Sequence, residues 1–253
     1  ERSILANKEL GELLNIENLS VIESFDNSNL FGSYTVSAMV TFIDGKPSKN
    51  DYRKFKISFD KNDDVGAMKE VIYRRYYSLL MNNKRMPDLI LVDGGINQIN
   101  ACNEVLNSLN IKIKVCGLMK DDKHTLRALV DGDTLETYEV NKKSNLFYLL
   151  TRISDEVHRF TINYHRQIRS KGSLESVLTN VNGIGETRKK ELLKKYGSLK
   201  KMTEASVSDL EEILPTNVAR DLHDYLISLK GSEKNEWLFN CKLNEWFYIF
   251  TIL

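Results

Sequence analysis

The chain has 253 residues, of which 42% are hydrophobic and 28% are charged, and its formal net charge is +1. These values are typical of a folded globular protein and exclude a disordered chain, whereas the net charge by itself indicates no partner. No apolar run reaches the roughly 18 residues of a membrane span, and the first residues lack the basic start and apolar core of a signal peptide. Cys102, Cys116 and Cys241 are widely spaced, which favours a reducing, cytoplasmic location over a disulfide framework or a zinc site.

The first third of the chain predicts a helix, three strands and a second helix. Residues 1–20 predict a short helix and a connection. Three β-rich segments with short turns between them predict an antiparallel meander: "VIESFD", which we expect to end as a strand at Asp26, "YTVSAMVTFI" (34–43) and "DYRKFKI" (51–57). Apolar residues at helical spacing in "DDVGAMKEVIYRRYYSLL" then predict a helix that Asp63 or Asp64 caps.

The middle of the chain predicts a parallel strand–helix–strand unit. "LILV" (89–92) is a continuous apolar strand of the kind that lies in a sheet covered on both faces. An amphipathic helix over 96–109 and a buried strand over 113–119 follow it, which makes this part of the sheet parallel. A weaker hairpin-like segment over 131–140 precedes a long helical pattern from about residue 144 to about residue 170. The fold class is therefore α/β, a mixed sheet with flanking helices.

The segment "SKGS" (170–173) is the predicted domain boundary, because strand patterns stop after it. We expect an α/β domain over 21–170 and a small all-helical domain over 171–230. The tail, 231–253, is apolar and aromatic without a clear period and receives no predicted role. Between Arg166 and Lys201 the sequence has ten Lys and Arg residues and three Glu. This local excess of positive charge is typical of a phosphate-binding surface or of a solvated helix face.

Two predicted strands end in an acid, Asp26 in the first and Asp93 after "LILV". If these strands are neighbours, their carboxylates lie close together, since adjacent strands are about 4.8 Å apart. Two such carboxylates raise each other's pKa unless a cation lies between them, and a hard cation such as Mg²⁺ or Mn²⁺ suits oxygen ligands. Gly94 and Gly95 follow Asp93 and give a ligand backbone room, although Asp-Gly-Gly is also a common turn. On the long helix, Asp155 and His158 share one face, which makes His158 the third candidate.

The second domain carries the sharpest local motif, "VNGIGETRKKELLKKYGSL". An apolar residue, Asn-Gly-Ile-Gly and a basic helix predict the hairpin of a helix-hairpin-helix motif, whose backbone N–H groups bind a DNA phosphate without reading bases. The DNA-binding candidates are Gly183, Gly185, Arg188, Lys189 and Lys190. A plain turn between packed helices is the alternative. A second hairpin is expected at Leu214-Pro215-Thr216-Asn217, where the glycines are missing, so that this degenerate hairpin serves mainly as a packing partner.

These blocks in this order resemble the C-terminal half of the bacterial excinuclease subunit UvrC, over about residues 8–230. The blocks are "IESFDNSNLFGSYTVSAMVTFIDGKPSKNDYRKFKI", "DDVGAMKEVIYRRY", "MPDLILVDGGINQINA", "NLFYLLTRISDEVHRFTINYHRQIRSK" and "VNGIGETRKKELLKKYGSL". The resemblance implies a ribonuclease-H-like endonuclease domain followed by a tandem helix-hairpin-helix domain. It also implies the 5′ incision beside a DNA lesion in nucleotide excision repair, a process that belongs to the SOS response.

The resemblance also implies the catalytic set. Asp26, Asp93 and His158 match the family's Asp-Asp-His set, which works with a divalent metal, and Asp64 matches a further acid associated with activity. Lys120 and Arg159 are weaker candidates for phosphate contact.

Damaged double-stranded DNA and the complex of UvrB with DNA are the implied partners of a monomer. The family's N-terminal nuclease domain and its UvrB-docking segment have no counterpart here, so we expect a fragment or truncated protein. A non-catalytic DNA-binding module and another ribonuclease-H-like nuclease or recombinase are the rival hypotheses.

Overall fold

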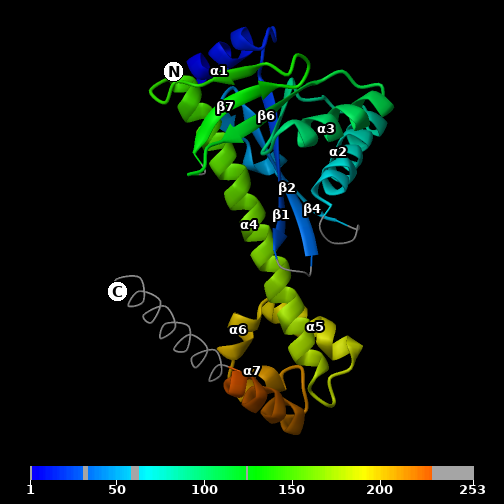
Figure 1. Ribbon diagram of the computed structural model, residues 1–253. Coiled ribbons are helices and arrows are strands. Elements are labelled where there is room, and N and C mark those ends of the chain that lie inside the picture. The colour runs from blue at the N-terminus through cyan, green and yellow to red at the C-terminus, as the bar shows by residue number, and fades with distance from the viewer. Residues whose placement is uncertain (1, 31–33, 58–62, 124, 230–253) are drawn as a thin grey trace, which may run out of the picture. The chain divides into compact units, whose positions relative to one another are not determined.

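The computed structural model describes residues 2–30, 34–57, 63–123 and 125–229 (Figure 1). The chain divides into two compact units, Glu1–His165 and Arg166–Leu253, which are described separately below. The predicted tail, with Cys241, lies outside the described residues. Cys102 and Cys116 are buried and make no disulfide.

The first unit is built on one eight-stranded sheet with the order β3-β2-β1-β5-β6-β7-β8, in which β4 pairs with β2. Its strands are β1 (Val21–Leu30), β2 (Tyr34–Ile43), β3 (Lys46–Pro47), β4 (Arg53–Lys56), β5 (Leu89–Val92), β6 (Lys114–Lys120), β7 (Leu126–Asp131) and β8 (Thr137–Glu139). The predicted meander is confirmed, because β1, β2 and β4 pair antiparallel in that order. The predicted parallel unit is confirmed as well, because β5 pairs parallel with β6.

Helices cover both faces of this sheet (Figure 1). On one face, α1 (Arg2–Leu13) and the first part of α4 (Asn145–Thr179) pack on alternate apolar residues of the strands. On the other face, α2 (Asp64–Met81) and α3 (Ile96–Ser108) pack on the remaining ones. Because successive side chains of a strand point to opposite faces, Ile22 lies in the first core and Phe25 in the second. Asp26 shares the face of Ile22 and therefore points toward α4.

The prediction that the first strand ends at Asp26 is wrong. β1 continues to Leu30, because it remains paired with β2 through a hairpin in which Leu30 lies opposite Tyr34. At Asp26 only the pairing of β1 with β5 ends, because Phe25 and Val92 are the last pair of residues that these two strands share. Asp26 thus lies inside a long strand, at the level where the shorter strand β5 stops.

The prediction that the long helix ends near Ser170 is also wrong, because α4 runs on to Thr179 through the whole "SKGS" segment. Leu174 and Leu178 continue the helical spacing and are fully buried in the core of the second unit. Burial of a Leu side chain contributes about 1.5 to 3 kcal/mol, which exceeds the roughly 1 kcal/mol that Gly172 costs inside a helix. The two units divide after His165, five residues before the predicted boundary.

The second unit is helical in the residues that the structure describes. After the end of α4 come α5 (Glu186–Tyr196), α6 (Leu199–Thr203), α7 (Val207–Glu211) and a helix over residues 216–229. Their apolar residues form one core around Leu192, Met202, Leu210 and Leu222, each of which is fully buried. Across the described parts of both units, no helix is long and apolar enough to cross a membrane.

Candidate functional site

The parallel pairing of β1 with β5 brings the two predicted acids together. Phe25 lies opposite Val92, and the Asp93 amide donates a hydrogen bond to the carbonyl oxygen of Phe25 at 3.1 Å. Asp26 and Asp93 are therefore the next residues on two adjacent strands, about one strand spacing of 4.8 Å apart. The sequence analysis expected the two carboxylates to lie close together if their strands were neighbours, and β1 and β5 are neighbours.

The third predicted residue reaches this point from α4. His158 Nδ1 lies 3.3 Å from Asp26 Oδ2, although 132 residues separate the two in the chain. One ligand atom from each of Asp26, Asp93 and His158 lies within 4.8 Å of the others, the arrangement needed to hold a metal ion. Asp26 is buried, whereas 56% of the His158 side chain is exposed. The site is thus anchored in the sheet and open on the helix side.

The electrostatics of the site fit a bound cation. Burial, and then the negative charge of Asp93, raise the pKa of the Asp26 carboxyl, while His158 and the Thr161 hydroxyl oppose this shift. On the other acid, Lys120 Nζ donates to Asp93 Oδ2 at 2.5 Å, so one positive charge already lies against the pair. The site thus offers two carboxylates, of which Asp26 has the raised pKa, and an adjacent imidazole. This set of ligand atoms suits a hard divalent ion.

Thr161 is a site residue that the sequence analysis missed. Its side chain is fully buried one helical turn after His158, and its hydroxyl donates to the carbonyl oxygen of Val157 at 2.8 Å. The spacing of three residues from His158 was the available signal, because residues at i and i+3 share a helix face. The contact of Lys120 with Asp93 is a further finding of the structure, because the sequence predicts Lys120 only as a phosphate contact.

The two glycines after Asp93 serve different purposes. A Cβ on Gly94 would lie 2.6 Å from Gln98 Cγ, so a side chain at this position would force the Gln98 side chain to move. Gly95 is the N-cap of α3, and nothing lies within 4 Å of where its Cβ would be. The open space beside Gly95 is thus the part of the turn that a ligand can approach.

Two other predicted residues lie outside the cluster. Asp64 is the first residue of α2, and its main-chain oxygen accepts a hydrogen bond from Asn27 Nδ2 at 3.2 Å. Arg159 Nε and Nη2 donate to the carboxylate of Glu156 at 2.9 and 2.8 Å. Neither belongs to the set of described residues whose ligand atoms converge.

In the second unit, the predicted hairpin combines backbone turns with exposed basic side chains. Gly183 has a φ of +90°, a conformation that L side chains rarely adopt, and Gly185 is the N-cap of α5. Arg188 and Lys190 are exposed, whereas Lys189 is half-buried. Arg188 Nη1 donates to the carbonyl oxygen of Gly183 at 3.0 Å, and Lys189 Nζ donates to Thr179 Oγ1 at 2.9 Å. These contacts fix the hairpin to the two helices that flank it.

The expected second hairpin packs against the first. Pro215 precedes the helix over 216–229, and its carbonyl oxygen accepts from the Ala219 amide at 2.9 Å. On this helix, Val218 Cγ2 lies 2.8 Å from where a Cβ of Gly183 would be. The absence of a side chain at Gly183 therefore has a packing reason in addition to its backbone conformation.

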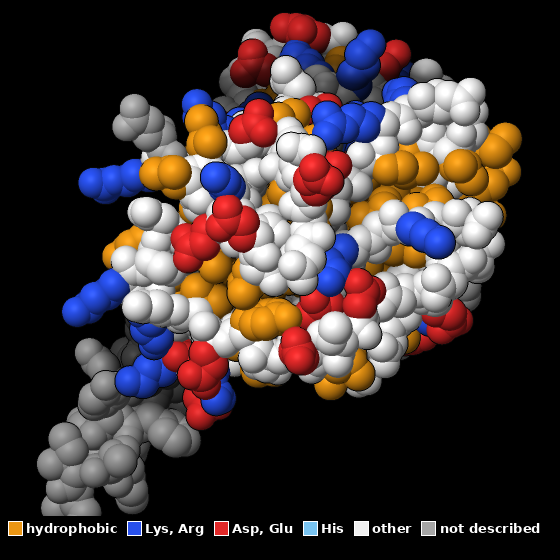
Figure 2. Space-filling view, turned by 90° about the horizontal axis from the view of Figure 1, so that it is seen from above, with side chains coloured by type: hydrophobic (Ala, Val, Ile, Leu, Met, Phe, Trp, Pro, Cys, Tyr) orange, Lys and Arg blue, Asp and Glu red, His pale blue; other side chains and the backbone are white. Residues whose placement is uncertain are grey.

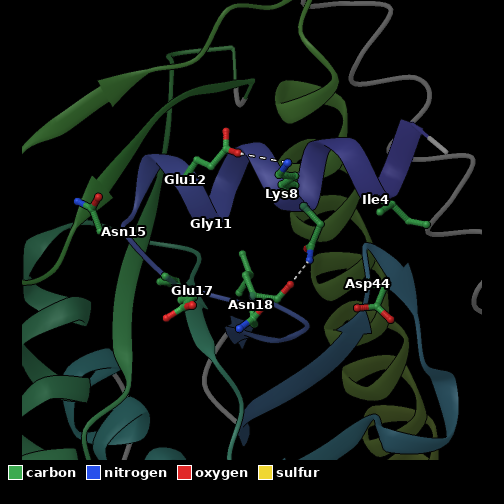
Figure 3. A pocket seen from close by; sticks show the side chains of 11 residues that line it. Ile4, Lys8, Gly11, Glu12, Asn15, Glu17, Asn18 and Asp44 are labelled. Atoms are coloured by element: carbon green, nitrogen blue, oxygen red, sulfur yellow. Dashed lines mark hydrogen bonds and ion pairs between the residues drawn. The ribbon is translucent and has the colours of Figure 1, made fainter.

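A pocket of about 660 Å³ lies away from the acidic site, between α1 and the residues that lead into β1 (Figure 3). Lys8 and Glu12 form an ion pair at its rim (Figure 3). Asn7 Nδ2 donates to the carbonyl oxygen of Leu19 at 2.6 Å. Asp26 lies five residues along β1 from its first residue, and Asp93 follows the last residue of β5. The pocket is thus separate from the candidate metal centre.

The mixed sheet with helices on both faces is a ribonuclease-H-like fold. Its two acids on adjacent parallel strands and the histidine from a covering helix form a site suited to a divalent metal. The chain belongs to the family of UvrC RNase H endonuclease domains, whose model matches residues 11–162. The matched segment includes the cluster of Asp26, Asp93 and His158. The first unit is therefore an endonuclease domain.

Solved structures with low similarity to the chain include three endonucleases V. The Ciona intestinalis enzyme in complex with a 24mer DNA that contains an inosine followed by a ribo-adenosine is 12% identical, with a TM-score of 0.37 over 60% of this chain and 88% of that one. Human ENDOV is 9% identical, with a TM-score of 0.34 over 65% and 98%. The Bacillus subtilis protein is 11% identical, with a TM-score of 0.35 over 60% and 84%. The family assignment rests on the family match and on the described site.

Proposed function

We propose that the protein is a metal-dependent DNA endonuclease that makes the 5′ incision beside a lesion in nucleotide excision repair. The observation that carries this proposal is the convergence of Asp26, Asp93 and His158 in a domain of the UvrC endonuclease family. Phosphodiester hydrolysis needs charge stabilisation at the scissile phosphate and an activated water, and both are within the reach of such a site.

Asp26 and Asp93 would hold Mg²⁺ or Mn²⁺, because carboxylate oxygens are the ligands these ions prefer. When bound, the ion supplies a water of lowered pKa and polarises a phosphoryl oxygen. His158 either completes the ligand set or transfers a proton, and its exposed ring allows both. Lys120, which holds Asp93, is also in reach of a bound phosphate, and Asp64 supports the activity from the start of α2.

The second unit would bind duplex DNA without reading its sequence. Gly183 and Gly185 bring backbone N–H groups to the surface before α5, and Arg188, Lys189 and Lys190 follow in the first turns of that helix. Phosphate contacts of this kind carry no base information and weaken as salt rises. Arg159 is a further candidate for phosphate contact in the first unit. We propose that the glycine-free second hairpin acts as support for the first.

The proposed setting is the bacterial cytoplasm, where a monomer acts on damaged duplex DNA that UvrB has already bound. This part of the proposal follows from the family to which the endonuclease domain belongs. A chain that depends on UvrB for recruitment should cut damaged duplex faster in its presence.

The test compares the wild-type chain with Asp26→Asn and Asp93→Asn on an end-labelled duplex that carries a nick, a lesion or a bubble, with and without Mn²⁺. We expect the wild type to cut only with the metal and both variants to lose incision while duplex binding is unchanged. Full incision by either variant would remove the catalytic assignment. Binding without cleavage by the wild type would leave a non-catalytic DNA-binding module, and preferred cutting of an RNA–DNA hybrid or a junction would indicate another ribonuclease-H-like enzyme.

A further inference from the structure

A basic strand edge lies next to the candidate metal centre. β4 pairs with β2 on one side, and no described strand pairs with its other side. Phe55 points into the core between the sheet and α2, whereas Lys54 and Lys56, one residue to either side, point to the opposite face and are exposed. Arg53 is exposed as well. The edge of the sheet thus carries three basic residues within four positions.

The strand register aligns these lysines with the catalytic acid. Ala38 of β2 lies opposite Asp26 on one side and opposite Lys54 on the other. In the next row of the same face, Val36 lies opposite both Ser28 and Lys56. Directly paired residues share a face, so Lys54 lies on the face of Asp26, two strand spacings or about 10 Å away.

The helix that carries His158 also holds Lys54 in place. Lys54 Nζ lies 5.3 Å from the ring centroids of both Phe160 and Tyr164, which are two and six residues after His158 on α4. An ammonium at this distance over an aromatic face is attracted by the ring, which limits the conformations of the side chain. Lys54 is therefore positioned by the same element that completes the metal centre.

Two carboxylates near β4 are each paired with an arginine. Arg74 of α2 donates to the main-chain oxygen of Lys56 at 2.9 Å and pairs with Glu70. The nearby carboxylate of Glu156 is held by Arg159. On the side of the molecule that Figure 2 shows, in contrast, acidic and basic side chains are interspersed over the surface.

We propose that Lys54 and Lys56 bind phosphates of the DNA strand that is being cut and so guide it to the site of Asp26 and Asp93. This inference rests on the proposed nuclease function and adds to it the path of the strand, across β2 toward the β4 edge. The occupant is a polynucleotide backbone, because a row of lysines in line with a metal centre complements a chain of phosphates and contacts no base edges.

The test measures the salt dependence of DNA binding by the full chain with a fluorescent duplex in EDTA, where cleavage does not contribute. The double variant Lys54→Ala/Lys56→Ala should show a slope of log Kd against log salt that is shallower by about 1.8, since each phosphate contact contributes about 0.9. Lys54→Arg/Lys56→Arg should restore the slope, because it keeps the charge. With Mn²⁺, the alanine variant should show a raised KM with kcat changed by less than about twofold, since uniform binding is lost.

The matched control is Lys84→Ala/Lys112→Ala, which removes two exposed lysines that precede β5 and β6, at the end of these strands away from Asp93. An unchanged slope in the β4 variant, or an equal change in the control, would overturn the proposed path. If the wild type still cuts DNA in that case, the nuclease function stands without it. If the β4 variant shows the shallower salt slope but the wild type cuts no substrate with Mn²⁺, DNA binding by the β4 surface would be supported and the nuclease function would be removed.

Discussion

The two units place their functional groups in different ways. In the first unit, two acids and a histidine come from distant parts of the chain and meet because β1 and β5 are in register and α4 crosses their face. In the second unit, Gly183, Gly185 and the basic residues lie within one short segment, and their arrangement depends on local backbone conformation. Catalytic chemistry needs groups held close together in a buried place, whereas contact with a phosphate backbone needs only exposed N–H groups and positive charge.

The two units also respond differently to substitution, because their cores are separate. A change at the acidic site should alter cutting and leave binding by the hairpin in place. A change at the hairpin should alter binding and leave the chemistry of each bound complex in place. The following predictions test that division.

After the loss of incision expected for Asp26→Asn and Asp93→Asn, the largest effect is expected for His158→Gln. We expect incision to fall by about a hundredfold or more, the range typical of a lost proton-transfer group, with duplex affinity unchanged. Titration with Mn²⁺ then separates the two roles of the imidazole, because a lost ligand weakens metal binding and a lost proton carrier does not. A variant that cuts at the wild-type rate would exclude a catalytic role for His158.

The next effect is expected for Gly183→Ala. The left-handed φ costs about 1 to 2 kcal/mol for a residue with a side chain, and the close approach to Val218 adds about 1 to 3 kcal/mol. We expect the helical unit to melt at a lower temperature, followed by far-ultraviolet circular dichroism.

Gly185→Ala is the matched control for that experiment, because nothing lies within 4 Å of its added carbon. Because Ala is a poorer N-cap than Gly, the free energy of unfolding of this variant should fall by about 0.5 to 1 kcal/mol, less than that of Gly183→Ala. If the hairpin binds phosphate, Gly185→Ala should still weaken duplex binding and flatten its salt dependence. Unchanged binding in both variants would favour a plain turn.

A pH effect is expected at the acidic site in metal-free protein. Burial and Asp93 raise the pKa of Asp26 in the folded state, so the folded state holds this proton more tightly than the unfolded state. The free energy of unfolding therefore falls as pH rises from 3.8, the ordinary pKa of an Asp carboxyl, through the folded pKa. Asp26→Asn should remove that loss and make the metal-free protein more stable at neutral pH, as measured by chemical denaturation in EDTA.

Asp131→Asn provides the opposite case for the same measurement. Burial by itself would raise the pKa of Asp131, but hydrogen bonds from Lys114 Nζ and from the Asp133 amide outweigh it and lower the pKa. Its contribution to stability is present above the unfolded pKa and is lost as pH falls. Asp131→Asn should therefore destabilise the protein at neutral pH, and equal effects of the two substitutions would contradict this account.

The smallest effect is expected for Gly172→Ala. Gly172 lies inside α4, and nothing is within 4 Å of where its Cβ would be. Alanine should then stabilise the helix by about 0.4 to 1 kcal/mol, seen as a higher unfolding temperature. No change or a loss of stability would mean that residues 170–173 act as a linker and not as helix.

Much of the fold was predictable because its elements carry local patterns. The continuous apolar run of Leu89–Val92 and the helix that Asp63 caps both agree with the structure. The two errors concern ends of elements, Asp26 in β1 and Ser170 in α4. Both arose because a partner, β2 in one case and the second core in the other, extends the element beyond its local signal.

Hydrophobic period, turn residues and short motifs are properties of neighbouring positions. They are sufficient to predict the α/β class of the first unit, the residue types of the candidate site and the family. No local pattern shows that Asp26 and Asp93 are adjacent, that Lys120 binds one of them and that Lys54 lies in line with the other. These are consequences of strand register, which pairs residues far apart in the chain and changes every contact if it shifts by one position.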